Sequence, residues 1–370
     1  MNYRETLEAI RRILDARPDL AVRHDLAKQV VRAFRVPAFY EMSQRCNLWC
    51  EGCYYFENKD RNARQDEQKI ESWQAFFEAE QLRNVSMAYF VGAEPALEQD
   101  RLRAAAGRIP YGKIGTNGTI PIDKDIPFRI GVSVWGDKET DTQLRGGSVL
   151  KKALRNYEGD PRAIMLFTLS PWNLHTVPEV LKMCRDHGIP LTFSIFSPTQ
   201  TYMEKIQAHQ APDNRFYRVA ASRGAPVFDD DGLKRLKDSF YWSLDNFADT
   251  VLFSEAYADW ICKPGPLYQL DEEGVATNCA SRIRRPLRYH NAQLESITPK
   301  CCTPDIDCSE CRLYSGGWSS KFVPEAQYLT SPTAFERWLD MLEVLGRIFL
   351  YPLPEIYQSL NQREPVRETA

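Results

Sequence analysis

The sequence predicts an α/β protein with a parallel sheet, followed by a small cysteine-anchored region near its C-terminal end. Strand-like and helical segments alternate from residue 39 to residue 196, which is typical of parallel βα units. Nine of the ten cysteines fall into two groups, at residues 46–53 and 262–311. A chain of 370 residues with 43% hydrophobic content is long enough for one large domain and a smaller one.

The first part of the chain alternates in a regular order. Residues 4–35 carry apolar side chains at helical spacing, interrupted near Pro18. The strands that we expect next cover residues 39–43, 85–91, 113–116, 128–135, 163–169 and 191–196. The helices that we expect around them cover residues 71–80, 97–106, 149–157 and 177–187.

The rest of the chain is less regular. Residues 198–225 lose the alternation and are rich in Gln, Pro and Arg, so we expect an irregular excursion over the end of the sheet. Helices are expected at 232–253 and 332–352, with a turn-rich region between them and disorder at 360–370.

Composition and charge exclude several classes of protein. The net charge of −3 implies no basic surface, so nucleic acid is not the expected partner. The sequence contains no run of 18 apolar residues, so we expect no membrane span. The charged residues from Arg4 onward do not resemble a secretory signal. Ten cysteines in a chain that is not exported favour metal or redox chemistry over disulfides, so we expect a cytoplasmic protein. Cys184 alone lies outside the two groups, and we expect it to be a small buried apolar residue.

The first group has the spacing C-x3-C-x2-C, with Cys46, Cys50 and Cys53 on one short segment. Three thiolates can hold a [4Fe–4S] cluster by three irons, which leaves the fourth iron open for a small molecule. A zinc ion would need a fourth ligand nearby, and no further cysteine lies close in the chain.

This segment resembles the radical S-adenosylmethionine (radical SAM) superfamily, through Arg45-Cys46-Asn47-Leu48 and the aromatic run after Cys53. The resemblance implies an open (β/α)6 partial barrel with the site at the carboxyl ends of its strands. Gly52 stands where most members place an aromatic residue against the adenine. Tyr54 or Tyr55 is then expected to take this contact, and we assign it to Tyr55.

Further residues match the superfamily's S-adenosylmethionine pocket. Gly92-Ala93-Glu94-Pro95 follows the second expected strand and resembles the Gly-Gly-Glu-Pro motif that contacts the amino group of S-adenosylmethionine. A plain β-turn is the alternative explanation of these four residues.

Three more residues are assigned to the same ligand by the resemblance. Asn117 lies in a Thr-Asn-Gly turn at the end of the third expected strand, although a plain turn explains that motif almost as well. Ser133 lies on the fourth strand, where members contact the ribose, and Arg145 follows where members hold the methionine carboxylate.

The second cysteine group has the spacing C-x11-G-x4-C, from Cys262 through Gly274 to Cys279. The intervening Asp-Glu-Glu-Gly turn predicts a hairpin that brings the two cysteines together. With Cys308 and Cys311 they supply four thiolates, which suit a closed cluster or a zinc ion.

This arrangement resembles the twitch domain, a shortened SPASM domain that carries an auxiliary [4Fe–4S] cluster. The resemblance implies that Cys262, Cys279, Cys308 and Cys311 are its ligands. Cys301 and Cys302 are left over, and either structural thiols or a hydrogen-atom donor would account for them. The expected division is a helical segment, the partial barrel, a linker with a helix, the auxiliary-cluster domain and a C-terminal helix with a tail, at 1–36, 37–200, 201–256, 257–320 and 321–370.

The resemblance implies reductive cleavage of S-adenosylmethionine to a 5′-deoxyadenosyl radical that abstracts hydrogen from a substrate. We expect an oxidoreductase that acts on a small-molecule or sugar-like compound, with the auxiliary cluster as electron acceptor and a flavodoxin or ferredoxin as reductant. The alternatives are peptide maturation and epimerisation, the latter with Cys301 or Cys302 as hydrogen donor.

Overall fold

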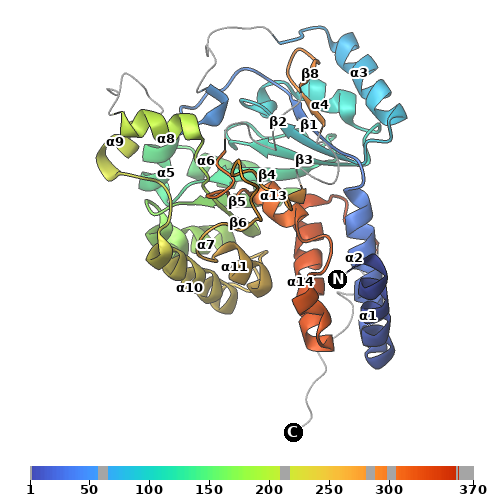
Figure 1. Ribbon diagram of the computed structural model, residues 1–370. Helices are drawn as coiled ribbons and strands as arrows, with labels where there is room; N and C mark the ends of the chain where they lie inside the picture. The colour runs from blue at the N-terminus through green and yellow to red at the C-terminus, as the bar shows by residue number, and fades with distance from the viewer. Residues whose placement is uncertain are drawn as a thin grey trace.

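The computed structural model describes residues 2–56, 66–208, 217–280, 288–297 and 306–355, together with Tyr357. In these residues eight strands form one sheet in the order β6–β5–β4–β3–β2–β1–β7–β8 (Figure 1). The strands are β1 (Pro37–Glu41), β2 (Met87–Val91), β3 (Tyr111–Thr116), β4 (Arg129–Val134), β5 (Ala163–Leu169), β6 (Leu191–Ile195), β7 (Arg288–His290) and β8 (Ser296–Ile297).

The six strands from β1 to β6 form an open partial barrel. Each pairs in parallel with the next strand in the chain, so spatial order follows chain order. In the described part of the chain β6 does not pair with β1, and a parallel bridge between Leu191 and Val251 lies at its outer edge. The predicted α/β class with six parallel units is therefore confirmed, and each predicted strand overlaps an observed one.

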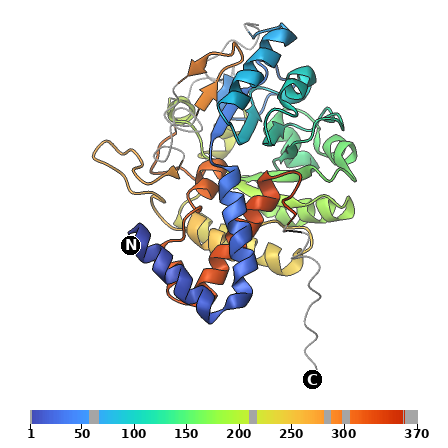
Figure 2. The same ribbon diagram turned by 90° about the vertical axis from the view of Figure 1, so that its right-hand side faces the viewer.

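Helices connect the strands and cover the sheet. Those of the βα units and their extension are α3 (Ile70–Leu82), α4 (Gln99–Ala105), α5 (Lys138–Arg145), α6 (Leu150–Tyr157), α7 (Val177–Asp186), α10 (Asp230–Asn246) and α11 (Glu255–Ile261). At the other side α1 (Tyr3–Ala16) and α2 (Ala21–Ala33) pack against the long α14 (Pro332–Phe349) (Figures 1 and 2). The short α13 (Tyr314–Ser319) leads the chain from the cysteine-rich region back towards the sheet.

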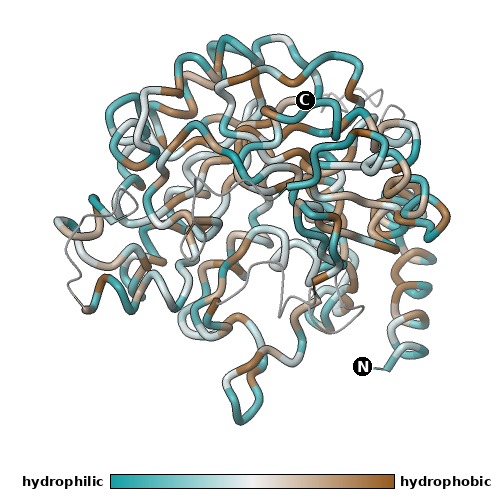
Figure 3. The backbone as a smooth tube through the Cα atoms, turned by 90° about the horizontal axis from the view of Figure 1, so that it is seen from above, coloured by the Kyte–Doolittle hydropathy of each residue, from teal (hydrophilic) through white to brown (hydrophobic). Residues whose placement is uncertain are grey.

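One hydrophobic core joins the terminal helices to the sheet. Buried side chains of α2, the six barrel strands and α14 belong to the same cluster, with Phe335 and Leu342 fully enclosed. Hydrophilic and hydrophobic residues alternate along the outer segments, as expected for amphipathic helices (Figure 3). No helix within the described residues is long and apolar enough to cross a membrane.

Several expectations about single elements need correction. The stretch expected to be irregular contains α8 (Gln200–Gln207), whose first turn is capped by the Thr199 hydroxyl, and α9 (Ala220–Arg223). The expected helix 232–253 ends at Asn246, because Leu252 donates its N–H to Leu191 and the chain there runs beside β6. The expected disorder at 360–370 lies outside the described residues.

The cysteine-rich region also contributes to the main sheet, which the sequence pattern does not indicate. β7 pairs with β1 in parallel, with Phe39 opposite Tyr289, and β8 follows it in antiparallel orientation. Three residues form too short a run for a periodic signal. The boundaries that we drew between domains stay a prediction.

Candidate active site

A cavity of about 320 Å³ lies where the barrel strands end. Parallel strands meet at one edge of a sheet, and Val91, Thr116, Ser133, Thr168 and Ser194 bring the ends of five strands to its wall. The structure brings most of the predicted pocket together there, namely Cys46, Cys50, Cys53, Gly92, Ala93, Glu94, Asn117, Ser133 and Arg145.

The start of the cysteine loop is held close to the turn after β2. The Ala93 N–H donates to the Ser43 carbonyl at 2.9 Å. Gly92 has φ +120°, and a Cβ atom there would lie 2.7 Å from the same carbonyl oxygen. Glycine is therefore required at position 92 both for its backbone conformation and for this close approach.

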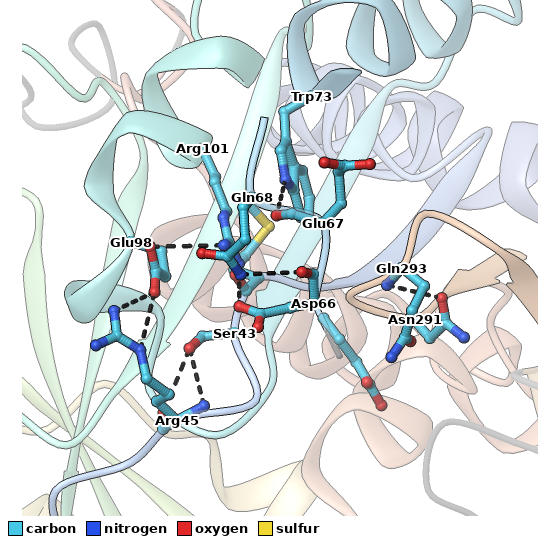
Figure 4. A network of polar contacts seen from close by, with 12 residues as sticks. Ser43, Arg45, Asp66, Glu67, Gln68, Trp73, Glu98, Arg101, Asn291 and Gln293 are labelled. Atoms are coloured by element: carbon cyan, nitrogen blue, oxygen red, sulfur yellow. Dashed lines mark hydrogen bonds and ion pairs between the residues drawn. The ribbon is translucent and has the colours of Figure 1, made fainter. Parts of the chain in front are cut away.

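A polar network braces the same segment from the side of α4 (Figure 4). Arg45, directly before the first cysteine, forms an ion pair with Glu98. The buried Arg101 guanidinium donates to the Met42 carbonyl at 2.7 Å and to Asp66 at 2.8 Å. These charge-assisted contacts fix the strand end from which the loop departs.

The rest of the cysteine loop is fastened to the end of α5. The Trp49 N–H donates to the Arg145 carbonyl at 3.2 Å, and the Glu51 N–H donates to the Leu144 carbonyl at 2.7 Å. Gly146 ends the helix with φ +73°, and a Cβ atom there would lie 2.8 Å from the Trp49 carbonyl oxygen. Gly146, in the left-handed conformation that ends α5, therefore also forms the surface that the loop contacts.

Glu94 is buried at the cavity and ties two strand ends together. Its carboxylate accepts hydrogen bonds from the Thr116 hydroxyl at 2.7 Å, the Asn117 N–H at 2.6 Å and the Ala96 N–H at 2.9 Å. Burial raises the pKa of Glu94, although these hydrogen bonds lower it. The side chain therefore positions the turns after β2 and β3 as well as lining the cavity.

Arg145 is the buried cation of the cavity. Its guanidinium donates to the carbonyls of Ser133 at 2.5 Å and Asn117 at 3.0 Å, and lies 3.7 Å from Asp141. Burial by itself lowers the pKa of Arg145, but attraction to Asp141 and Cys50 raises it above its ordinary value. Its Nε is buried without a partner within hydrogen-bond distance among the described residues, and the Cys50 thiol interacts with the guanidinium.

Asn117 connects the third strand end to the first cysteine. Its amide donates to Asn47 at 2.7 Å and lies 3.8 Å from the sulfur of Cys46. Its side-chain oxygen accepts from both the N–H and the hydroxyl of Thr119. The Thr-Asn-Gly turn is therefore held against the start of the cysteine loop by the Asn117 side chain.

Tyr55 is the one predicted pocket residue that does not line the cavity. It is buried, and its hydroxyl donates to Glu41 at 3.2 Å, because the one-turn helix at 54–56 directs the ring towards β1. Its neighbours Tyr54 and Phe56 line the cavity instead.

Some lining residues carry no signal in the sequence. Phe196 lies at the end of β6, and its ring would be 2.9 Å from a Cβ atom on Gly52. The Trp135 ring packs edge-on against the Phe196 ring, with 5.7 Å between the two ring centres. Their positions at the ends of predicted strands could have identified them as candidates, but nothing in the pattern assigns them a role.

The three loop cysteines suit a shared iron–sulfur ligand. All three line the cavity, and burial together with the nearby Cys50 and Cys46 raises the pKa of Cys53 to about 12. Within the described ranges, no three His, Cys, Asp or Glu side chains are spaced to hold a single metal ion. A cluster binds each thiolate through a different iron, so soft ligands spread around one cavity fit it.

In the second cysteine group, Cys262 follows the last residue of α11, and Cys311 lies shortly before α13. The predicted hairpin is confirmed, since Leu270 and Ala276 form an antiparallel bridge and Gly274 turns the chain with φ +77°. Cys262, Cys279, Cys308 and Cys311 all pack against the main core. Cys301 and Cys302 lie outside the described residues, so their expected roles stay predictions.

Comparison with known proteins gives one curated relative and several structures. No family model matches the chain. Fe-coproporphyrin III synthase of Methanosarcina barkeri (strain Fusaro / DSM 804) is 28% identical over 167 residues, a match that covers 41% of this chain and 41% of the relative. The chain thus matches less than half the length of this relative.

Two solved structures resemble part of the chain. Streptococcus suis SuiB bound to S-adenosylmethionine has 15% identity and a TM-score of 0.47, over 70% of this chain and 58% of that one. anSMEcpe with bound AdoMet has 15% identity and a TM-score of 0.48, over 72% of this chain and 74% of that one. The cysteine loop, the pocket around it and the curated relative support the resemblance of the chain to the radical SAM superfamily.

Proposed function

We propose that the protein binds S-adenosylmethionine in the 320 Å³ cavity and cleaves it reductively to start a radical reaction. Cys46, Cys50 and Cys53 would hold a [4Fe–4S] cluster, which when bound supplies the electron that converts S-adenosylmethionine to methionine and a 5′-deoxyadenosyl radical. The observation that carries this proposal is that three thiols, a buried carboxylate and a buried guanidinium line one cavity at the strand ends.

The chain's own residues bind and orient the ligand. The unpartnered Nε of Arg145 is suited to a carboxylate, and a buried guanidinium binds such a group strongly. Ser133 and the Gly92–Glu94 turn supply polar groups at the wall, while Phe196, Trp135 and Phe56 supply apolar surface that excludes water.

The finer part of the proposal is oxidation of a small-molecule or sugar-like substrate. Hydrogen abstraction leaves one unpaired electron on the substrate, so a two-electron oxidation needs an acceptor for it. Cys262, Cys279, Cys308 and Cys311 would hold an auxiliary [4Fe–4S] cluster, which supplies that electron-accepting chemistry. A flavodoxin or ferredoxin would provide the reducing electron at the barrel site.

Formation of 5′-deoxyadenosine tests the first part. The anaerobically reconstituted enzyme, given S-adenosylmethionine and a low-potential reductant, should form it, and Cys46→Ala should not. Arg145→Lys keeps the charge but loses the planar set of guanidinium N–H donors. It should weaken S-adenosylmethionine binding about 10- to 100-fold, as expected when a charge-assisted hydrogen bond is lost.

Arg162→Lys is the matched control, because Arg162 is also buried but lies before β5, at the opposite edge of the sheet from the cavity. Unchanged binding in Arg145→Lys, or equal weakening in the control, would contradict the assignment of Arg145 to the ligand.

The oxidation is tested with a Cys262→Ala/Cys279→Ala variant. It should still cleave S-adenosylmethionine but form no oxidised product. Persistent oxidised product would refute the acceptor role. Deuterium from heavy water in an inverted carbon of the product would instead support the epimerase alternative.

A further inference from the structure

Arg312 is a buried cation in the cysteine-rich region, and Glu310 is the carboxylate of the described residues that raises its pKa. Its side chain is 8% exposed, and no carboxylate of the described residues lies within ion-pair distance of it. Its guanidinium donates to the carbonyls of Ile261 at 2.8 Å, Lys263 at 2.9 Å and Gly265 at 3.2 Å. Carbonyl dipoles satisfy its donors but do not neutralise its charge, and a buried charge without a counterion is costly.

These contacts connect the two halves of the second cysteine group. Two of the three carbonyls belong to the residues on either side of Cys262. Arg312 itself directly follows Cys311 in the chain. The side chain therefore holds the segment of the first cysteine against the turn that carries the last one.

The backbone of Arg312 also reaches the cavity. Its N–H donates to the Ser197 hydroxyl at 3.0 Å, and Ser197 lines the cavity just beyond β6. One residue thus joins the edge of the proposed S-adenosylmethionine site to both segments that would carry the auxiliary ligands.

The surrounding charges indicate what would neutralise this guanidinium. Burial lowers the pKa of Arg312, whereas the nearby Cys262, Glu310 and Cys311 raise it. A cluster held by four thiolates carries a net negative charge and becomes more negative when reduced. Its reduction potential rises when a positive charge and hydrogen bonds lie close to it.

We propose that Arg312 is the charge partner of the auxiliary cluster, and that it raises the cluster's reduction potential so that the cluster can accept the substrate's electron. This inference rests on the proposed function, because it requires a cluster at Cys262, Cys279, Cys308 and Cys311. In this step the substrate radical gives one electron to the oxidised cluster, which becomes reduced. The substrate also gives one proton to water.

The test uses the full chain with Cys46, Cys50 and Cys53 replaced by Ala, so that only the auxiliary cluster remains. The measurements are iron content and the midpoint potential in a reductive titration followed by electron paramagnetic resonance. Arg312→Met should retain about four irons per chain and shift the midpoint to a lower potential. Arg312→Lys, which keeps the positive charge but not the planar guanidinium donors, should shift the midpoint potential less.

Arg162→Met is the control for loss of a buried guanidinium. Arg162 also donates to three backbone carbonyls, but it is paired with Asp160 and lies before β5, away from the cysteines. It should leave both iron content and midpoint unchanged. An unchanged midpoint in Arg312→Met, an equal shift in the control, or complete loss of iron in both Arg312 variants would overturn the charge-partner role.

Failure of the proposed function gives a different result. If the background with only the auxiliary cysteines holds no iron, the auxiliary cluster itself is absent and the oxidation proposal fails with it. If it holds about four irons and only the potential is insensitive to Arg312, the oxidation proposal survives and this inference alone is wrong.

Discussion

Gly146 is the residue at which the end of α5 meets the cysteine loop. Its φ of +73° disfavours any side chain, and an added Cβ would lie 2.8 Å from the Trp49 carbonyl oxygen. Gly146→Ala should therefore combine backbone strain with displacement of the loop. We expect it to lower the free energy of unfolding by about 2–4 kcal/mol and to reduce iron incorporation at the barrel site.

Gly159→Ala separates the two effects. Gly159 has nearly the same φ, +72°, but nothing lies within 4 Å of its added Cβ. It should cost about 1–2 kcal/mol and leave iron incorporation intact. Chemical denaturation and iron analysis of both variants would check this, and equal iron loss in the two would show that the loop contact is unimportant.

At the residue scale, the sequence predicts the chemistry of a side chain better than the direction in which the side chain points. The thiols and the Gly92–Glu94 turn could be recognised because their residue types and spacing are tied to one chemistry. Tyr55 could not be placed, because neighbouring aromatic residues differ only in which way a short turn points them. Arg312 could not be recognised either, because its role depends on carbonyls about fifty residues earlier in the chain.

At the scale of elements, Glu51 links the cysteine loop to the helices after β6. Its buried carboxylate accepts from the Tyr202 hydroxyl at 2.7 Å and from the N–H groups of Val219 and Ala220 at 3.0 and 3.2 Å. Glu51→Ala leaves three buried donors without their acceptor, which costs about 1–3 kcal/mol for each unsatisfied group. Hydrogen exchange should then quicken in α8 and α9.

Tyr202→Phe removes only one of these contacts and should quicken exchange less. Exchange in β5 should be unchanged in both variants, since it lies in the strand core. If α8 and α9 exchange as in the wild type after Glu51→Ala, the carboxylate does not hold them.

The elements themselves could be predicted where periodicity is long. The six barrel strands and α14 follow from runs of apolar residues at a regular spacing. α5 was not predicted, because its exposed face is polar and its burial comes from the cysteine loop. β7 is held by backbone pairing with β1, which a single sequence does not reveal.

At the scale of the whole molecule, Lys113 fastens the inner face of the sheet to the C-terminal helices. Its side-chain nitrogen donates to the Tyr314 hydroxyl at 2.7 Å and lies 4.3 Å from the centre of the Phe349 ring. Burial lowers the pKa of Lys113 well below its ordinary value, with Arg129 adding to the effect. The folded chain therefore holds this proton more weakly than the unfolded chain does.

This predicts stability that rises with pH until the unfolded pKa of about 10.4 is reached. The wild type should therefore gain stability with rising pH relative to Lys113→Met, measured by urea unfolding between about pH 7.5 and 9.5 under anaerobic conditions. The exposed Lys151→Met is the control and should follow the wild type. Parallel pH profiles for wild type and Lys113→Met would mean that Lys113 remains protonated in the fold.

We expect one chain to carry two separate iron–sulfur sites, with the first at Cys46, Cys50 and Cys53. Iron and sulfide content after anaerobic reconstitution tests it most directly, in the wild type and in the variant with these three cysteines replaced by Ala. Two sites predict about eight irons per chain in the wild type and about four in the variant. About four irons falling to nearly none would leave the barrel site but remove the auxiliary acceptor, and iron that is unchanged by the three substitutions would rule out the barrel site.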